Sequence, residues 1–240
     1  MRVIATPEST PAAFAAKAAT TTIPIVFSVG VDPVAVGLVA SLNRPGGNLT
    51  GVTNLNAEIL PKRLELMHEL VPTATTIALL VNPSNPLVAE TESRDAQTAA
   101  RTLGLQLHVL HASTDRDFDT VFASLAQMRA VALVINTDVF FNSRSEQLAA
   151  LALRHTVPAI FQYREFVASG GLMSYGRLET TDVFRQVGIY TSRLLRGESP
   201  ADLPVQQVTK IELIINLKTA RTLGLTVPLS LLGRADEVIE

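Results

Sequence analysis

Residues 131–141 read VALVINTDVFF, and the class of fold can be inferred from this stretch. Its first six residues, 131–136, form a mainly apolar run that predicts a strand buried on both faces. The run ends at Thr137 and Asp138, and two phenylalanines follow at 140 and 141. Strands buried on both faces belong to parallel sheets that are covered by helices on either side. The stretch therefore predicts an α/β fold with polar groups at the carboxyl end of a central strand.

The same pattern recurs along the chain. Four further β-rich runs occupy residues 24–29, 76–81, 105–110 and 157–162. The segments between the runs carry apolar residues at helical spacing, in three groups: Leu60, Leu64, Met67 and Val71; Phe118, Val121, Phe122 and Leu125; Val183, Val187, Tyr190 and Leu194. Gly104 and Gly197 stand where helices should end, and Thr114 with Asp117 predicts an N-terminal cap. This alternation predicts doubly wound parallel sheets.

The elements fall into two sets. Residues 76–162 hold four strands, which are enough for one doubly wound sheet. Residues 1–53 hold a smaller set, in this order: a strand at 2–5, a helix at 10–19, a strand at 24–29, a helix at 33–43 and a strand at 49–53.

Composition excludes several classes of function. The 240 residues are 47% hydrophobic and 18% charged, which is typical of a globular protein with a sizeable core. A net charge of −2 without a basic run argues against nucleic acid or an anionic membrane surface as a partner. The absence of cysteine excludes disulfides and thiolate chemistry. No apolar run reaches the roughly 18 residues of a membrane helix, and the first residues lack the pattern of an export signal.

Cofactor and metal chemistry has no motif to support it. The sequence has no glycine-rich phosphate loop and no G-x-S-x-G nucleophile elbow. The run DRDFD at 115–119 resembles the start of a calcium loop, but Thr120 and Ala126 replace the required Gly and Glu. His108 and His111 lack a companion carboxylate motif. We therefore expect no cofactor and no metal site.

Polar residues follow several predicted strands, at the ends where open α/β sheets bind ligands. The candidates at these ends are Asp32, Asn82, Ser84, Asn85, Thr137, Asp138, Gln162, Tyr163 and Glu165. Ser9 and Thr10 open a predicted helix, where free N–H groups favour an anion. The aromatic residues near two of the strand ends are Phe140, Phe141, Phe161 and Tyr163. One carboxylate, small polar groups and aromatic walls suit a small zwitterion with an apolar side chain. Each polar residue also fits a helix cap, and the phenylalanines also fit a core position.

Several stretches resemble the ABC-transporter substrate-binding family related to tryptophan and tyrosine uptake proteins. The most specific are NRPGGNLTG at 43–51 and INLKTARTLGL at 215–225, and IALLVNPSNP at 77–86 adds to them. The resemblance implies the type I periplasmic binding fold, in which two α/β lobes joined by three crossovers hold a ligand between them. It implies a first lobe of residues 1–53 and 177–204 and a second of 54–176 and 205–240. The crossovers should then fall near Val52–Asn54, Tyr175–Gly176 and Leu203–Val205.

The resemblance also implies a function. The chain would be the non-catalytic solute-binding component of an ABC importer, located in the periplasm, that presents a small amino-acid-like ligand to a membrane permease. Amino acids with an aromatic side chain are among the candidate ligands. Asp138 with Thr137 would meet the ligand's amino group. Asn82, Ser84 and Asn85 would face the ligand from the same lobe, and Ser9, Thr10 and Asp32 from the other lobe. Two alternatives stay open: a ligand-sensing regulatory domain of the same fold, and an α/β enzyme that uses Asp138 or Glu165 as a general base.

The start of the chain differs from the family pattern. Family members begin with an export signal and two strand–helix units before the run that matches RVIATPEST at 2–10. We therefore expect the first lobe to lack these two units, so that its strand at 2–5 is an open edge. An unpaired edge strand is a template for association with another chain. The expected consequence is self-association through the first lobe.

Overall fold

The computed structural model describes residues 2–128, 130–177 and 180–240. The chain divides into two compact units, which we describe one at a time. Unit 1 comprises Met1–Asn56 and Arg177–Lys210, and unit 2 comprises Ala57–Gly176 and Ile211–Glu240.

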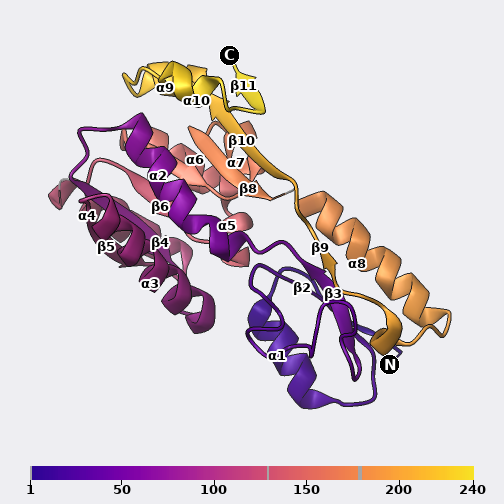
Figure 1. Ribbon diagram of the computed structural model, residues 1–240. Coiled ribbons are helices and arrows are strands. Elements are labelled where there is room, and N and C mark those ends of the chain that lie inside the picture. Colours follow the sequence, from indigo (N-terminus) through magenta and orange to yellow (C-terminus); the bar gives the residue numbers. More distant parts are fainter. Residues whose placement is uncertain (1, 129, 178–179) are drawn as a thin grey trace. The chain divides into compact units, whose positions relative to one another are not determined.

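Unit 1 contains a four-stranded parallel sheet. Its strands, in spatial order, are β1 (Ile4–Thr6), β2 (Ile25–Val29), β3 (Leu49–Thr53) and β9 (Gln206–Gln207). Two helices, α1 (Thr10–Ala19) and α8 (Thr180–Leu195), lie on opposite sides of this sheet (Figure 1). Val183 and Val187 of α8 pack on Val26 and Val52 of the sheet, as the helical spacing predicts.

Unit 2 contains a seven-stranded sheet. Its strands, in chain order, are β4 (Thr76–Val81), β5 (Gln106–His111), β6 (Leu133–Ile135), β7 (Ala159–Phe161), β8 (Met173–Arg177), β10 (Ile211–Asn216) and β11 (Glu237–Ile239). Their spatial order is β11-β10-β8-β7-β6-β4-β5, and every pair whose register is described is parallel. The helices of this unit are α2 (Leu60–Leu70), α3 (Pro86–Thr102), α4 (Asp115–Gln127), α5 (Val139–Asn142), α6 (Ser145–Arg154), α7 (Arg164–Ala168), α9 (Leu217–Thr222) and α10 (Leu229–Leu232).

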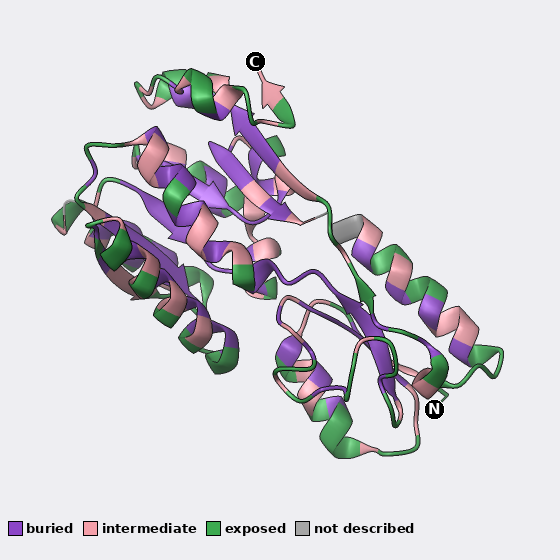
Figure 2. Cartoon of the chain, in the orientation of Figure 1, coloured by how far each residue is buried: buried purple, intermediate pink, exposed green. Residues whose placement is uncertain are grey.

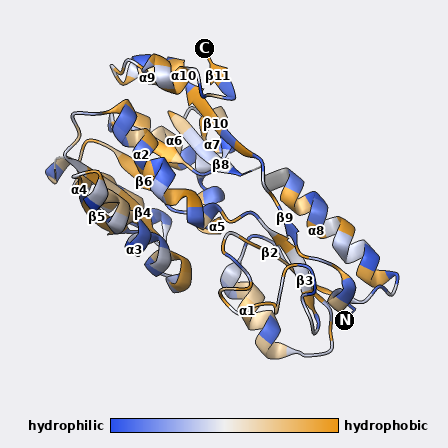
Figure 3. Cartoon of the chain, in the orientation of Figure 1, coloured by the Kyte–Doolittle hydropathy of each residue, from blue (hydrophilic) through white to orange (hydrophobic). Residues whose placement is uncertain are grey.

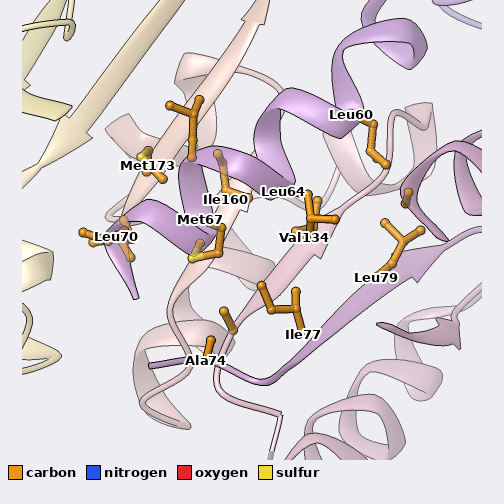
Figure 4. Packing of buried hydrophobic residues seen from close by; sticks show 14 of the residues in the cluster. Leu60, Leu64, Met67, Leu70, Ala74, Ile77, Leu79, Val134, Ile160 and Met173 are labelled. Atoms are coloured by element: carbon orange, nitrogen blue, oxygen red, sulfur yellow. The ribbon is translucent and has the colours of Figure 1, made fainter. Parts of the chain in front are cut away.

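The central strands of unit 2 are buried on both faces. Along β4, Ile77 and Leu79 belong to one apolar cluster, whereas Ala78 and Leu80 belong to another. Alternate residues of a strand point to opposite faces, so both faces of the sheet carry a core. Figure 4 shows the first core, in which Leu64 of α2 packs over the sheet. Figure 2 shows the central strands of this sheet as buried, and Figure 3 shows β6 and β10 as hydrophobic.

Most of the predicted elements are confirmed. The strands predicted at 49–53 and 76–81 have those limits in the structure, and the 131–136 run contains β6. Gly104 and Gly197 follow helices with positive φ angles of 70° and 99°. Asp117 caps α4, because its carboxylate accepts the backbone N–H groups of Ser113 and Thr114.

The helix predicted at 33–43 is wrong. This segment is a series of turns, in which the Pro33 carbonyl accepts the N–H groups of both Leu38 and Val39. Gly37 has a φ of 73°, a left-handed conformation that ends a helical path. Leu38 and Val39 are buried all the same, and their burial explains why the apolar pattern looked helical.

The third crossover lies later than predicted. Residues 205–210 were expected in the second lobe, but they belong to unit 1. The Val205 N–H donates to the Leu42 carbonyl, and β9 pairs with β3 in parallel. The chain passes to unit 2 after Lys210, and it passes between the units elsewhere after Asn56 and Gly176. β9 has two exposed polar residues, so it carries no apolar signal that could have been recognised.

Candidate functional site

The strongest candidate site lies at the carboxyl edge of the unit 2 sheet. β4 and β6 are hydrogen-bonded neighbours with parallel register, so their carboxyl ends lie at the same edge. The segment after β4 supplies Asn82 and Asn85, and the segment after β6 supplies Thr137 and Asp138. All four side chains are buried or nearly so. The sheet topology thus brings together residues that are more than 50 positions apart in the sequence.

Asp138 is the centre of this arrangement, with 4% of its surface exposed. Its Oδ1 accepts the side-chain amide of Asn82 at 2.8 Å, and its Oδ2 accepts that of Asn85 at 3.0 Å. Oδ1 also accepts the Phe140 backbone N–H at 2.9 Å, so Asp138 is in addition the N-cap of α5. The capping interpretation of Asp138 is therefore right for one bond out of three. The two bonds from the β4 segment are not capping bonds, because their donors are side chains.

The edge presents acceptor atoms rather than donors. A carboxylate offers about four acceptor positions, and three bonds to Asp138 are described. The Asn85 amide must direct its nitrogen at the carboxylate, which leaves its Oδ1 buried without a protein partner. The Asn82 Oδ1 accepts the Ser84 backbone N–H at 3.0 Å. An ammonium group, which has three donors and no acceptor, matches this edge.

A buried charged pair lies next to Thr137. The Thr137 backbone N–H donates to both oxygens of Glu92, at 3.1 and 3.4 Å. Arg63 of α2 donates from Nη1 to the Thr137 hydroxyl at 3.3 Å and from Nε to the Tyr175 carbonyl at 2.8 Å. Arg63 and Glu92 are both fully buried. Burial raises the pKa of Glu92 to about 8 against the opposing charge of Arg63, and burial lowers the pKa of Arg63 to about 10.

Sequence reasoning missed this pair, although a signal was present. Arg63 lies on the same face of α2 as Leu60, Leu64 and Met67, the apolar stripe that predicts this helix. Glu92 likewise interrupts the buried face of α3. A charged residue at an apolar position of a helical stripe indicates a buried charge, which requires a partner.

The aromatic residues are mostly core residues. Phe141 and Phe161 are fully buried in the apolar cluster, so the expectation that they form ligand walls is wrong. Phe140 is half-buried, and its ring stacks on Phe118 with the centroids 5.5 Å apart. Tyr163 is buried at the start of α7. The large apolar residues that stay exposed at this edge are instead Leu87 in the first turn of α3 and Val139 in α5, at 37% and 42%.

The remaining candidates occupy separate places. Glu165 is half-buried in the first turn of α7, after β7. In unit 1, Ser9 is the N-cap of α1 and accepts the Ala12 N–H at 3.3 Å, and Thr10 is buried in the first turn of this helix. Asp32 follows β2, and its Oδ1 accepts the Val34 N–H at 2.8 Å. The bonds described for Ser9 and Asp32 are local capping and turn bonds.

Within residues 2–128, 130–177 and 180–240, no group of three His, Asp or Glu side chains could hold a metal ion. Within the same ranges, none of the helices combines the length and apolar character needed to cross a membrane.

Known proteins resemble this chain over most of its length. The chain is 30% identical over 217 residues to a tyrosine-binding protein of Clostridioides difficile (strain R20291). The match covers 90% of this chain, which spans 61% of that relative. The crystal structure of an ABC domain in complex with L-Trp from Streptococcus pneumonia superposes with a TM-score of 0.81 at 28% identity, covering 99% of this chain and 78% of that chain.

A conserved domain protein from Vibrio cholerae O1 biovar El Tor superposes with a TM-score of 0.85 at 29% identity. This match covers 98% of our chain and 78% of the Vibrio chain. The two parallel sheets and these neighbours show the type I periplasmic binding protein fold. The model of the family described as "ABC transporter substrate binding protein" matches residues 1–239. The chain therefore belongs to the ABC transporter substrate-binding protein family.

Proposed function

We propose that this chain is the solute-binding component of an ABC import system and that it binds an aromatic amino acid. The observation that carries the proposal is the acceptor edge of unit 2, where Asp138 and the buried, unpaired Oδ1 of Asn85 lie together. Family membership supports it, and so do relatives described as binding tyrosine and as complexed with L-Trp.

The edge suits both ends of such a ligand. A charge-assisted bond from the ligand ammonium to Asp138 is worth more in this buried setting than at an open surface. Leu87 and Val139 leave apolar surface exposed close to Asn85 and Asp138 in the sequence. In our proposal the ligand's side chain covers this surface, which supplies the hydrophobic part of the affinity. Ser84, Thr137 and Phe140 lie close to Asn85 and Asp138 in the sequence and belong to the proposed site. Tyr163 and Glu165 of unit 2, and Ser9, Thr10 and Asp32 of unit 1, are further candidate ligand residues in this proposal.

The same proposal includes a partner and a location. A membrane permease would accept the ligand from this chain, in the periplasm or its equivalent outside the cell membrane, as is usual for an ABC importer. We also retain self-association as a proposal, because β1 is an edge strand of the unit 1 sheet.

Catalysis is not part of the proposed role. For Asp138 to act as a general base, one of its oxygens would have to reach a substrate proton. Three acceptor positions of the carboxylate are taken by Asn82, Asn85 and Phe140, and in our proposal the remaining position accepts the ligand's ammonium group. The arrangement is better suited to holding a cation than to removing a proton.

Calorimetry with a matched set of ligands tests the function. L-Tryptophan and L-tyrosine should bind saturably, and 3-(4-hydroxyphenyl)propionate, which lacks the amino group, should bind at least about tenfold more weakly because Asp138 then has no cation to hold. Mass spectrometry should recover the amino acid unchanged after incubation. Turnover of the ligand would support the enzyme alternative, and equal affinity for the deaminated analogue would refute the role of Asp138.

A further inference from the structure

The buried Arg63–Glu92 pair contacts the segment that carries the candidate ligand site. Arg63 comes from α2 and Glu92 from α3, two helices that pack on each other. Glu92 accepts the backbone N–H of Thr137, and Arg63 donates to the hydroxyl of the same residue. Thr137 is thus held by its main chain and by its side chain, one position before Asp138.

The pair also connects two strand ends. Arg63 donates from Nε to the Tyr175 carbonyl in β8, while its Nη1 reaches Thr137 after β6. β7 lies between these two strands in the sheet. One guanidinium therefore fixes the spacing of the backbone on either side of β7.

Stability alone does not explain such a pair. Burying two charges is costly, and well-packed apolar residues at the same positions are often neutral or stabilising. The apolar stripe of α2 would continue without interruption if residue 63 were apolar, since Leu60, Leu64 and Met67 already occupy this face. The cost is offset by what the two charges hold in place, which is the Thr137–Asp138 segment.

We infer that Arg63 and Glu92 are positioning residues for ligand binding, which fix Thr137 so that Asp138 presents its carboxylate to the ligand's ammonium group. The inference rests on the proposed function, because it assigns these residues to the same site. Neither residue needs to touch the ligand, and both are fully buried.

The charges around Glu92 predict that the affinity for the ligand depends on pH. The groups that act on Glu92 are Arg63 from α2 and Asp138 after β6, and Tyr163 and Tyr175 lie near Arg63. The positive charge of Arg63 favours the Glu92 carboxylate, and the negative charge of Asp138 disfavours it. A ligand ammonium beside Asp138 favours the ionised form of Glu92, so affinity should rise as the pH rises through the Glu92 titration near 8.

Three variants separate positioning from simple stability. Glu92→Gln keeps the shape but removes the charge. The double variant R63M/E92L replaces both charges with apolar groups of similar size, which buried pairs often tolerate. Met67→Ala is the matched control, because Met67 is fully buried one turn further along α2 and packs in the apolar cluster.

Two measurements apply to each variant. Calorimetry with L-tryptophan from pH 6.5 to 8.5 gives the affinity, and amide hydrogen exchange of ligand-free protein gives the protection of the Thr137 N–H. We expect R63M/E92L to bind about tenfold more weakly, the scale of one hydrogen bond to a charged group. Glu92→Gln should match the parent affinity at pH 6.5 and fall below it as the pH rises through the Glu92 titration near 8. Both variants should lose the rise in affinity between pH 7 and 8.5. R63M/E92L should also lose the Thr137 protection, whereas the side-chain oxygen of glutamine at position 92 can still accept the Thr137 N–H. Met67→Ala should unfold at lower temperature but keep the parent affinity and pH profile.

Each outcome decides a different point. If both charge variants keep the parent affinity, pH profile and Thr137 protection, the positioning role is refuted. If they change only as much as Met67→Ala does, the pair serves stability alone and the inference fails. If the parent binds neither tryptophan nor tyrosine, the proposed function fails, and the exchange of the Thr137 amide still shows whether the pair holds this segment.

Discussion

The carboxyl edges of the two sheets use similar polar residues in different ways. In unit 1, Ser9 and Asp32 accept backbone N–H groups only two or three residues further along the chain. In unit 2, Asp138 accepts side-chain amides from Asn82 and Asn85, which are 56 and 53 positions away. The candidate residues of the first edge form local caps and turns, whereas those of the second edge form a side-chain network that exists only in the folded sheet.

A cap and a ligand site differ in which groups their hydrogen bonds satisfy. A cap satisfies a backbone group that the local structure would otherwise leave unpaired, and it typically contributes about 1 kcal/mol. The amides of Asn82 and Asn85 instead turn their nitrogens toward a side-chain carboxylate, and the Asn85 Oδ1 is left buried without a protein partner. Such an arrangement makes sense when a ligand supplies the missing donor.

Asp138→Asn should weaken ligand binding more than any other single substitution at the two edges. We expect it to weaken binding of the amino acid by roughly 1.5–3 kcal/mol, because a hydrogen bond to a charged group is lost, while the protein stays folded. The new amide also turns a donor toward Asn82 or Asn85, so a decrease in melting temperature should accompany the loss. Calorimetry and thermal unfolding measure both quantities. Unchanged affinity would reduce Asp138 to a cap of α5.

Asn85→Ala should have the second largest effect. It removes the unpaired Oδ1 and one of the amides that orient Asp138, and we expect a loss of about 1 kcal/mol in binding, the usual value for one neutral hydrogen bond. Asn48→Ala is the control, since the Asn48 amide donates to the Thr20 and Ile23 carbonyls of unit 1 and Asn48 is not among the candidate ligand residues. Equal effects of the two variants on calorimetric affinity would argue against a specific role for Asn85.

The sequence predicts the sheets better than the site. β3 and β4 have the predicted limits because each is a continuous β-rich run between turn residues. The polar strand ends of unit 2 could also be predicted, because parallel strands bring them to one edge. The network among Asn82, Asn85 and Asp138 could not, since it depends on which strands become neighbours.

The other features that the sequence did not predict also have physical explanations. β9 is held by pairing with β3 and has no apolar residue to reveal it. The predicted helix at 33–43 failed because burial of Leu38 and Val39 can be achieved by turns as well as by a helix. Arg63 and Glu92 were overlooked because a search for apolar spacing ignores the charged residues that share the same face.

Leu87→Ala tests the apolar part of the unit 2 edge. Leu87 is 37% exposed, so truncation should change stability little. If an aromatic side chain covers it, affinity for tryptophan should fall by roughly 0.5–1.5 kcal/mol, the scale of part of a buried aliphatic side chain. Affinity for alanine, measured in the same titrations, should be unaffected. Leu229→Ala, at an exposed leucine of α10, is the matched control. A similar decrease for tryptophan and alanine would show that Leu87 acts through the fold rather than through the ligand's ring.

Asp32→Asn should have the smallest effect on binding and would sharpen the contrast between the two edges. Asp32 is half-exposed, and its Oδ1 already accepts the Val34 N–H at 2.8 Å. Asparagine keeps an oxygen that can form this turn bond, so stability should change by less than about 0.5 kcal/mol. Because the Asp32 carboxylate is only partly buried, an ion pair that it forms should contribute about 1 kcal/mol or less. Titrations of Asp32→Asn and Asp138→Asn with L-tryptophan, at low and high salt, measure the difference directly. If Asp32→Asn weakens binding as much as Asp138→Asn does, the unit 1 edge contributes as strongly as unit 2, and local hydrogen bonding is no guide to which strand ends bind the ligand.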